Sequence, residues 1–496
     1  MISVLPTSSI SVSGGRANAR TVTAFFAAIF LLLVSGAAAQ TVTQLKHQPA
    51  DGIQLTFQLT DGTVLGQGYN DTDWYKLTPD NTGSYVNGTW TQVASLPSGY
   101  SPDAYSSATL ANGKVLIEGG EYNFGNFALT NLGAIYDPVA NTWTNVSPPK
   151  GWKYIGDSPS SVLADGTYLI GNKLTKQLRL LDPKTMTWST LSSKGKKDFD
   201  AEEGWTLLAD GDILTADVKA APNSELYSSA ARKWTTAGST IVDLHSPSPD
   251  GCINYGPGGK LCYYPPGEIG PQILRPDGTV YVTGSYTKGG SGPGHTAYYN
   301  SLAGGWTVGP DFPNGDNAGD SFAALLPNGE VLVEGDSGVS YTWDGSKLTP
   351  GPYLGGALMV LPTGQILIAG SPSAVYNPTG TYESSWQPTI STYPSTVTRG
   401  STYAISGTQF NGLSQANAFG DEYQTNTNYP LVQITNNSTK HVFYARTHDH
   451  SSMGVATGSA TVSTNFDVPA SMETGASTLV VIANGIPSAS VNVTVQ

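Results

Sequence analysis

One pattern of apolar and polar residues recurs seven times between residues 55 and 370. In each copy a few apolar residues lead into an Asp-Gly, Asn-Gly or Thr-Gly pair, and a run of aliphatic and β-branched residues follows, as in "SVLADGTYLIG" and "ALLPNGEVLVEG". The turn glycines are Gly62, Gly113, Gly166, Gly211, Gly278, Gly329 and Gly364. Because Asp and Asn tolerate left-handed geometry and glycine has no Cβ to clash there, each copy predicts a strand, a tight turn and a second strand.

A second pattern follows in most copies, and it predicts another hairpin that carries an aromatic residue. A tyrosine or other apolar strand leads to a tryptophan, as in "YDPVANTWTNV" and "LDPKTMTWSTL", whereas the seventh copy has "YNPTGTYES". The tryptophans are Trp90, Trp143, Trp188, Trp234, Trp306 and Trp343. We expect these aromatics to pack between neighbouring units.

Four strands per unit with a period near 50 residues are typical of kelch-type propeller blades. Seven blades close a ring, so that no sheet keeps a long unpaired edge. The turn glycines are 35 to 67 residues apart, and the longest interval, Gly211 to Gly278, predicts an insertion between blades four and five.

The chain changes character after Trp386, where Thr, Ser and Val become frequent and the turn pattern no longer recurs. Alternating strands over roughly 100 residues are the usual size of an immunoglobulin-like unit. The sequence therefore predicts an all-β protein, with a seven-bladed kelch-type β-propeller at 41–386 and an Ig-like (E-set) β-sandwich at 387–496. Further blades are the alternative for the second part.

The N-terminus has the features of a secretory signal peptide, which we place at residues 1–40. Arg16 and Arg20 precede an apolar run at 24–34, and small residues follow in "SGAAAQ". The run is short for a bilayer span, so an uncleaved anchor is the less favoured alternative. We expect a secreted, extracellular protein, or a periplasmic one if the host is Gram-negative, with no membrane span after cleavage.

Charge and cysteine content narrow the possible partners. The formal net charge is −13, and 12% of residues are charged. Such an acidic chain is a poor partner for nucleic acid or anionic lipid, which leaves cations and neutral, hydroxyl-rich ligands.

In an exported chain, Cys252 and Cys262 of "CINYGPGGKLC" predict a local disulfide, with two free thiols as the alternative.

Carboxylates recur about nine residues before the turn glycines, where the innermost strand of each blade begins near the channel mouth. Five of the seven copies have them: Asp103, Asp157, Glu202 with Glu203, Glu268 and Asp320. The other two copies have Ile53 and Gly355 at this position. Acids gathered in this way take up protons, recruit a cation or accept hydrogen bonds from sugar hydroxyls. The alternative is that each caps backbone N–H groups around the rim.

The segment "RTHDHSSMG" carries two of the six histidines, His448 and His450. On an extended segment they point the same way. If the segment reaches the channel mouth, the two imidazoles and the carboxylates could bind a divalent metal (Cu, Zn, Mn or Ca). A histidine beside carboxylates would also have a raised pKa and suit a proton donor. The alternative is that Asp449 pairs with its histidine neighbours at the surface.

A secreted kelch propeller followed by an Ig-like domain resembles the galactose oxidase and glyoxal oxidase family. The resemblance implies a mononuclear copper, a tyrosyl radical cross-linked to a cysteine, and a histidine ligand from a loop of the C-terminal domain. Thr447-His448, with Met453 shortly after, is similar to that loop, which makes His448 the implied copper ligand. Gly319-Asp320 stands where the family has a Tyr-His pair, and neither cysteine lies at a predicted inner strand. The resemblance therefore implies a degenerate copper site.

Two functions follow from these patterns, and a surface or matrix protein whose ring presents loops to partner proteins is a third alternative. The first is a secreted binding protein that takes an extracellular carbohydrate or similar polyhydroxyl ligand at the acidic mouth, with Trp152, Tyr154 and Trp205 as possible stacking surfaces. The second is an enzyme: a divergent metal-dependent oxidase, or a hydrolase or lyase acting on carbohydrates through Asp157, Glu203, Glu268 or Asp320. The sequence does not decide between them, and it does not indicate the oligomeric state.

Overall fold

The computed structural model describes residues 40–246, 251–255, 259–263, 267–286 and 292–496, and for 251–255 and 259–263 it describes the backbone alone. The predicted signal peptide therefore lies outside the described residues, apart from Gln40. The described chain is almost entirely β, with two single-turn 3-10 helices, η2 (Pro313–Gly315) and η3 (Ser384–Trp386). This confirms the all-β prediction. No helix among the described residues is long and apolar enough to cross a membrane.

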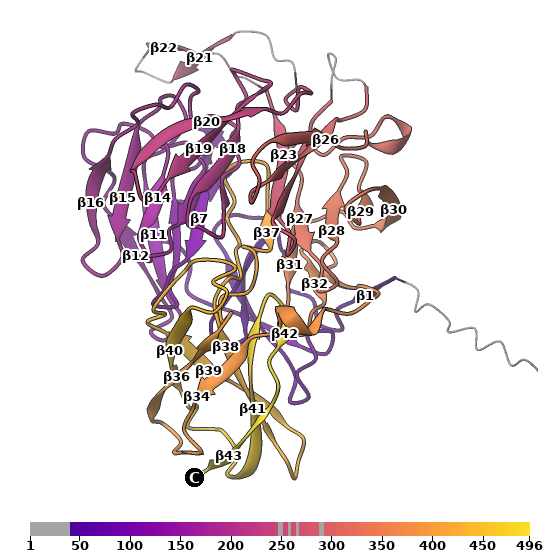
Figure 1. Ribbon diagram of the computed structural model, residues 1–496. Helices are drawn as coiled ribbons and strands as arrows, with labels where there is room; N and C mark the ends of the chain where they lie inside the picture. Colours follow the sequence, from indigo (N-terminus) through magenta and orange to yellow (C-terminus); the bar gives the residue numbers. More distant parts are fainter. Residues whose placement is uncertain (1–39, 247–250, 256–258, 264–266, 287–291) are drawn as a thin grey trace, which may run out of the picture. The chain divides into compact units, whose positions relative to one another are not determined.

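Seven antiparallel sheets correspond to the seven sequence repeats (Figure 1). Six have four strands, and that of blade six has four strands of its own and a fifth from the C-terminal part. The first three blades consist of β2 (Leu55–Gln58), β3 (Val64–Gln67), β4 (Trp74–Thr78) and β5 (Thr89–Gln92); β7 (Ser106–Thr109), β8 (Val115–Glu118), β11 (Gly133–Asp137) and β12 (Thr142–Val146); and β13 (Ser160–Val162), β14 (Tyr168–Ile170), β15 (Leu178–Asp182) and β16 (Thr187–Leu191). The next three consist of β17 (Thr206–Leu207), β18 (Ile213–Ala216), β19 (Asn223–Ser228) and β20 (Lys233–Ser239); β23 (Ile269–Leu274), β24 (Thr279–Gly284), β25 (Thr296–Asn300) and β26 (Trp306–Val308); and β27 (Ala323–Leu325), β28 (Val331–Glu334), β29 (Val339–Trp343) and β30 (Leu348–Tyr353).

Blade seven takes its outer strand from the start of the described chain. It consists of β31 (Leu358–Val360), β32 (Ile366–Ile368), β33 (Ala374–Asn377) and β1 (Thr41–Gln44). β1 pairs antiparallel with β33, with Thr41 opposite Asn377. This explains why the seventh repeat lacks its tryptophan: the outer strand that would carry it comes from elsewhere in the sequence.

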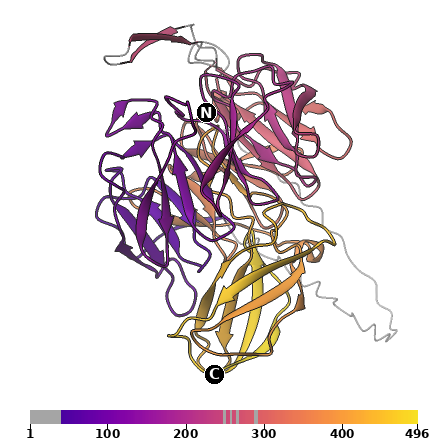
Figure 2. The same ribbon diagram turned by 90° about the vertical axis from the view of Figure 1, so that its left-hand side faces the viewer.

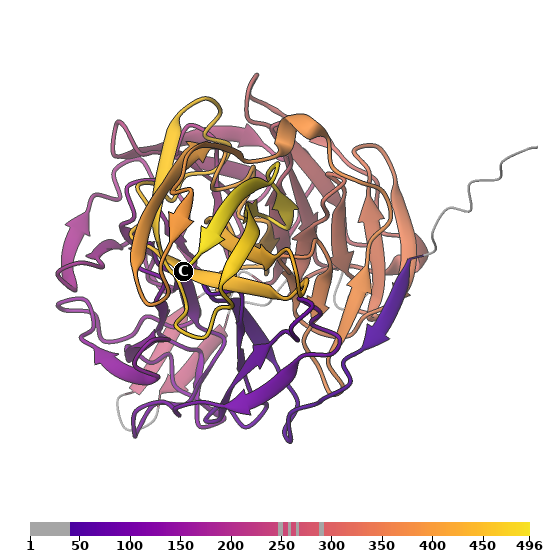
Figure 3. The ribbon, with the colours of Figure 1, turned by 90° about the horizontal axis from the view of Figure 1, so that it is seen from below.

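Inner strands of neighbouring blades pack together at β7 and β13, at β17 and β23, at β23 and β27, and at β27 and β31, and the contact between β31 and β2 closes the ring. Figure 3 shows the blades arranged around the axis. The seven turn glycines all have left-handed backbone, with φ between 76° and 85°, as the turn pattern predicts.

The tryptophans of the outer strands tie neighbouring blades together. The indole Nε1 of Trp143 donates to Ala94 O at 3.1 Å, and that of Trp188 donates to Ser147 O at 2.7 Å. In both cases the acceptor belongs to the segment that follows the preceding blade. The predicted packing between units is therefore confirmed.

The insertion between blades four and five contains a hairpin of β21 (Gly251–Tyr255) and β22 (Gly259–Tyr263). Its register places Cys252 directly opposite Cys262. Their side chains lie outside the described part of the structure, so the disulfide stays a prediction.

The C-terminal part forms β-sheets of its own, outside the blades, and is coloured orange to yellow in Figure 2. Its strands are β34 (Thr389–Thr392), β35 (Thr396–Val397), β36 (Thr402–Thr408), β38 (Leu431–Asn436), β39 (Val442–His448), β40 (Thr461–Asp467), β41 (Gly475–Ala483), β42 (Ile486–Pro487) and β43 (Val491–Val495). They are paired in the order β34-β36-β40-β39-β38-β41-β43-β35, and alternate residues bury a core of their own. The immunoglobulin-like assignment and the boundary at 386 stay predictions.

Candidate functional site

The C-terminal part sends one long loop into the channel of the propeller. Residues 414–430, "SQANAFGDEYQTNTNYP", connect β36 to β38 and are buried throughout. Within them β37 (Asn417–Ala418) pairs with β27, the innermost strand of blade six. The loop is polar, so its burial requires that its hydrogen-bonding groups find partners inside the ring.

Those partners are the inner strands of the blades. Gln415 Oε1 accepts a hydrogen bond from Leu207 N at 2.8 Å in blade four, and Asn417 Oδ1 accepts one from Val360 N at 2.9 Å in blade seven. Gln424 N donates to Ser107 Oγ at 3.0 Å in blade two. We call residues 414–430 the channel loop.

The backbone takes the same left-handed turn where each inner strand begins. The residues with positive φ there are Gly52, Ala104, Gly156, Glu202, Gly267, Asp320 and Gly355. Four are glycines, but Glu202 at φ 55° and Asp320 at φ 49° carry side chains that this region disfavours. The repeated turn brings one residue from each blade to the same end of the channel.

Four predicted acids and the tip of the channel loop form one carboxyl cluster at that end. The cluster consists of Asp157, Glu202, Glu268 and Asp320 from the blades, and Asp421 and Glu422 from the loop. Carboxylate oxygens of Asp157, Glu202 and Asp421 lie within 4.8 Å of one another. Burial is graded: Asp320 is exposed and Glu268 is half-buried, whereas Asp157, Glu202, Asp421 and Glu422 are buried.

Lys173 supplies a positive charge in the floor of this cluster. Its ammonium contacts Asp157 Oδ2, and it lies 2.5 Å from Glu202 Oε1. Burial works to raise the pKa of Glu202, but the charge of Lys173 and hydrogen bonds with Asp421 and Glu268 hold it below its ordinary value. Burial raises the pKa of Asp157 well above its usual range, with Lys173 acting in the opposite direction.

The other carboxyl groups of the cluster have raised pKa values. Burial, followed by the charges of Glu202 and Asp320, raises the pKa of Glu268 to about 11. Asp320 is exposed as a residue, but neighbouring protein atoms desolvate its carboxyl group, and this effect together with the charge of Glu202 raises its pKa to about 6. The pKa of Glu422 rises to about 8. The cluster therefore holds protonated carboxyl groups, which donate hydrogen bonds, beside ionised ones, which accept them.

Asp103 lies at the edge of the same end and is held by an aromatic residue of the channel loop. Tyr423 Oη donates to Asp103 Oδ1 at 2.7 Å, and the Tyr423 ring packs edge-on against Tyr105, with centroids 5.1 Å apart. Gln54 Nε2 also donates to Asp103 Oδ1, at 3.1 Å. Four of the five predicted blade positions thus converge with the loop tip, and the fifth, Asp103, lies beside it.

A small aromatic hairpin stands next to Asp103. It is formed by β6 (Pro102–Asp103), β9 (Tyr122–Asn123) and β10 (Asn126–Phe127), and its register places Asp103 opposite Tyr122. Tyr122 is 36% exposed and Phe124 is 53% exposed. The pKa of Tyr122 is raised by burial and by the neighbouring Glu121 and Asp157, which places this ring close to the acids. Exposed aromatic faces beside polar groups are suited to stacking on sugars.

Three predicted site residues do not join this cluster. Glu203 is adjacent to Glu202, but its carboxylate accepts hydrogen bonds from Lys196 at 2.8 and 2.9 Å in a second buried network within blade four. Because Glu202 has a left-handed backbone, the two neighbouring side chains diverge. His448 and His450 do not join it either.

The segment from Thr447 to Met453 does not reach the acidic mouth, so the condition for a metal site of His448, His450 and the blade carboxylates is not met. Thr447 N donates to Thr60 O, His450 N to Ala111 O and Met453 N to Ala164 O, at 3.0 to 3.2 Å. These acceptors lie at the turns that end the inner strands, whereas the acids stand where those strands begin. The channel loop occupies the axis in its place.

The two histidines also point to different surroundings, because Asp449 between them has a left-handed φ of 54°. His448 contacts Asp449 Oδ2 at 2.7 Å and Asp467 Oδ1 at 3.2 Å, as the surface-pair alternative predicts. His450 is buried against Tyr429, contacts Thr464 Oγ1 at 2.9 Å, and has its pKa lowered to about 3, chiefly by burial.

The donors around the axis do not fit copper. They are carboxyl oxygens, phenols and the Lys173 ammonium, whereas copper prefers imidazole and softer ligands. His245, His295 and His441 contact Asp243, Asp311 and Glu473 respectively, none of which belongs to the cluster. The oxidase chemistry that the sequence resemblance implies has no ligand set among these described residues.

Two of the suggested stacking surfaces are buried. Trp152 donates to Gln177 Oε1 at 2.9 Å, and Trp205 packs on Trp234 with centroids 5.8 Å apart. Both are less than 7% exposed, so they stabilise the blades and present no face to a ligand.

Comparisons with known proteins give structural likenesses only. No family model matches the chain, and no curated protein matches it. A fungal alcohol oxidase of the AA5 family, solved in complex with copper, is similar over 93% of this chain and 100% of its own, at 12% identity and a TM-score of 0.49. A catalytically inactive virginiamycin B lyase from Staphylococcus aureus, solved with quinupristin, is similar over 68% of this chain and 98% of its own, at 9% identity and a TM-score of 0.44. Likeness at this level assigns no activity, and the fold rests on the sheets described above.

Proposed function

We propose that the protein is exported and binds a neutral, hydroxyl-rich extracellular ligand, a carbohydrate, at the acidic mouth of its propeller. The observation that carries the proposal is the exposed ring of Tyr122, which lies opposite Asp103 at the edge of the carboxyl cluster, with exposed Phe124 two residues further along the chain. Stacking faces next to convergent polar groups are what a sugar ring requires, because its C–H face is apolar and its edge carries hydroxyls.

The mixed protonation of the mouth supports this choice of ligand. A sugar hydroxyl both donates and accepts, so it pairs with a protonated carboxyl such as Glu268 and with an ionised one such as Asp320. Asp320 is exposed and can reach a ligand in solvent. A negatively charged ligand would be repelled by the same residues.

The test is binding to a panel of neutral oligosaccharides derived from β-glucan, xylan, chitin and galactan, followed by calorimetry on the best binder. We expect the double variant Tyr122→Ala/Phe124→Ala to weaken binding about tenfold or more, since one stacking contact contributes about 1 kcal/mol. Asp320→Asn should weaken it by a similar factor.

The matched control is Tyr393→Ala, because Tyr393 is a comparably exposed aromatic, at 37%, in the C-terminal part. This variant should bind like the unmodified protein. Equal binding by the double variant and the unmodified protein, or no binding to any member of the panel, overturns the proposal.

A second candidate is acid–base cleavage of the bound carbohydrate, favoured by the Glu268–Asp320 pair. The two carboxyls are hydrogen-bonded to each other, and their pKa values are pushed apart, to about 11 and about 6. Separated pKa values in neighbouring carboxyls assign one as acid and the other as base. Here Glu268 would donate the proton and Asp320 would accept one. If this function is present, Glu268→Gln abolishes release of reducing ends while binding to the same oligosaccharide persists.

A further inference from the structure

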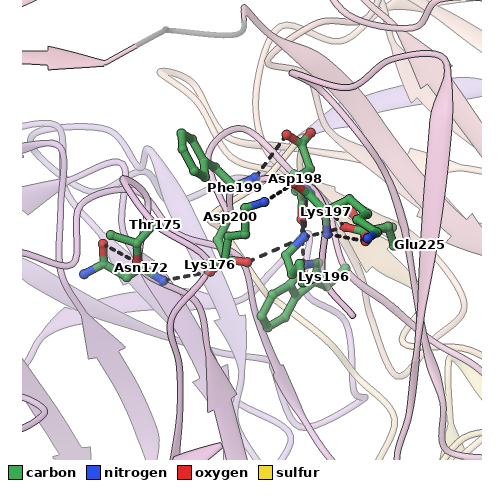
Figure 4. A network of polar contacts seen from close by, with 12 residues as sticks. Asn172, Thr175, Lys176, Lys196, Lys197, Asp198, Phe199, Asp200 and Glu225 are labelled. Atoms are coloured by element: carbon green, nitrogen blue, oxygen red, sulfur yellow. Dashed lines mark hydrogen bonds and ion pairs between the residues drawn. The ribbon is translucent and has the colours of Figure 1, made fainter. Parts of the chain in front are cut away.

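The second buried network, in blade four, gathers five acids around Lys196, and a second lysine, Lys176, acts on Asp217 from nearby. Its acids are Asp198, Asp200, Glu203, Asp217 and Glu225, and all five are at least 97% buried. Lys196 lies among them, 2.8 Å from Glu203 Oε2, 3.2 Å from Glu225 Oε2 and 3.7 Å from Asp200 Oδ1. Figure 4 shows Lys196, Asp198, Asp200 and Glu225 converging in this network. Buried charges of one sign require protons or a counter-ion.

Three of these carboxylates have the spacing of cation ligands. Oxygens of Asp198, Glu203 and Asp217 lie within 4.8 Å of one another. Oxygens that bind one Ca²⁺ ion, each at about 2.4 Å from it, lie up to about 4.8 Å apart, so the three carboxylates are close enough to share such an ion. Ca²⁺ also accepts irregular geometry, whereas Mg²⁺ demands a regular octahedron.

The hydrogen bonds hold two of the three ligands in place and leave the third without a partner. Asp198 Oδ2 accepts from the backbone N–H groups of Val218, Lys219 and Ala220 at 2.8 to 3.2 Å, which fixes this carboxylate beside the segment that carries Asp217. Glu203 is fixed by Lys196 and by the indole of Trp205, 3.3 Å from Oε2.

Asp217 itself is 3% exposed, and its Oδ1 is buried with no hydrogen-bond partner among the described residues. A buried carboxylate oxygen without a donor is costly, and the carboxylate that carries it has an oxygen within 4.8 Å of oxygens of Asp198 and Glu203. This orphan oxygen is the independent sign that a ligand belongs in the network.

The axial cluster is different, although its acids Asp157, Glu202 and Asp421 have the same spacing. There the Lys173 ammonium contacts two of the three carboxylates. In blade four, Lys196 hydrogen-bonds one of the three, Glu203, whereas Asp198 is held by backbone N–H groups and Asp217 keeps an unpaired Oδ1. The axial cluster also keeps unpaired oxygens, on Asp157 and Asp421, but its lysine already lies between the carboxyl groups.

From this geometry we propose that Asp198, Glu203 and Asp217 form a Ca²⁺ site that joins the loop before blade four to the segment after β18. The ion would neutralise the carboxylates that Lys196 leaves uncompensated. It stabilises the blade, and it is separate from the carbohydrate site proposed above.

The experiment measures thermal unfolding of the mature protein with EDTA and with added Ca²⁺, together with luminescence of bound Tb³⁺, which substitutes for Ca²⁺ at oxygen sites. We expect Ca²⁺ to raise the Tm and to displace Tb³⁺. Trp205 lies beside the site, so exciting tryptophan should sensitise the Tb³⁺ emission, and Trp205→Phe should reduce that emission while Ca²⁺ still raises the Tm.

Asp217→Asn should abolish the Ca²⁺-dependent rise in Tm and weaken Tb³⁺ binding about tenfold or more, because the ligand charge falls. The matched control is Asp421→Asn, which removes one acid of the axial cluster and should leave both responses unchanged. A Tm that is the same with EDTA and with Ca²⁺ overturns the site. A response lost in Asp421→Asn but kept in Asp217→Asn also overturns it, because it assigns the ion to the axis.

Discussion

Replacing Lys173 by methionine tests whether the axial cluster depends on one buried cation. Methionine keeps much of the side-chain volume but removes the charge that faces Asp157 and Glu202. Lys173 is 1% exposed, and both carboxylates are buried, so solvent cannot replace the lost partner. Breaking a buried pair by removing one member costs about 3–5 kcal/mol, because the other charge is left uncompensated.

The cost should depend on pH in a direction set by the carboxyl groups. Burial alone would lower the pKa of Lys173, but the charges of Asp157 and Glu202 raise it well above its ordinary value, so the ammonium is charged at neutral pH. Without it, the folded-state pKa of Glu202 rises above the unfolded value of about 4. The folded variant then binds more protons than the unfolded chain, so its stability falls as the pH rises from about 4 to 8. The difference in free energy of unfolding between the unmodified protein and the variant therefore increases from pH 4 to pH 8.

The assay is urea unfolding followed by tryptophan fluorescence at pH 4, 6 and 8. The control is Lys114→Met, which removes a salt bridge of 2.8 Å to Asp137 whose side chains are 36% and 28% exposed. That pair should contribute about 0–1 kcal/mol, with little pH dependence. The reasoning would be refuted if Lys173→Met lowered the free energy of unfolding by no more than the control does. It would also be refuted if that loss decreased from pH 4 to pH 8.

Two further substitutions probe how the C-terminal part is attached. Tyr423→Phe removes the hydroxyl that donates a hydrogen bond to Asp103 at 2.7 Å. In urea titrations it should lower the free energy of unfolding by about 1–3 kcal/mol. An unchanged free energy of unfolding would mean that this contact does not hold the channel loop. Gly62→Ala adds a Cβ at φ 76° that would lie 2.2 Å from the Tyr444 ring, whereas the same change at Gly166, φ 85°, meets only an ordinary contact at 3.6 Å. Both variants place an alanine in left-handed backbone, which costs about 1 kcal/mol, so the difference between them reports the clash with Tyr444. Calorimetry should show a clearly lower Tm for Gly62→Ala than for Gly166→Ala, and equal Tm values would contradict the close packing.

The fold could be predicted from the sequence because its signal is local and repeated. Each blade carries its own turn glycine and its own alternating strands, and seven imperfect copies reinforce one another. The origin of the outer strand of blade seven could not be read in the same way, since Thr41–Gln44 pairs with Ala374–Asn377 across most of the chain. Only the missing tryptophan of the seventh repeat hinted at it.

The candidate site was predicted in part for the same reason. Counting about nine residues back from each turn glycine located Asp157, Glu202, Glu268 and Asp320. Counting could not separate Glu202 from Glu203, because a single left-handed residue decides which of the two side chains faces the axis. Asp421 and Glu422 belong to no repeat, so counting could not find them. Their signal was a long polar segment between two strands, which is uncommon in a compact domain unless it has a function.

The pairing of β1 with β33 has a consequence for how the protein is made. During synthesis six blades can complete themselves from adjacent sequence as they emerge, but the seventh lacks an outer strand until residues 374–377 meet residues 41–44. Until then β1 and the edge of β33 are open to pairing with other chains, which is the usual beginning of aggregation. The channel loop, residues 414–430, is translated later still, so it enters a ring that is already assembled or is closing around it. Truncation shortly after Asn377 should therefore yield a ring with an unfilled axis that is prone to self-association.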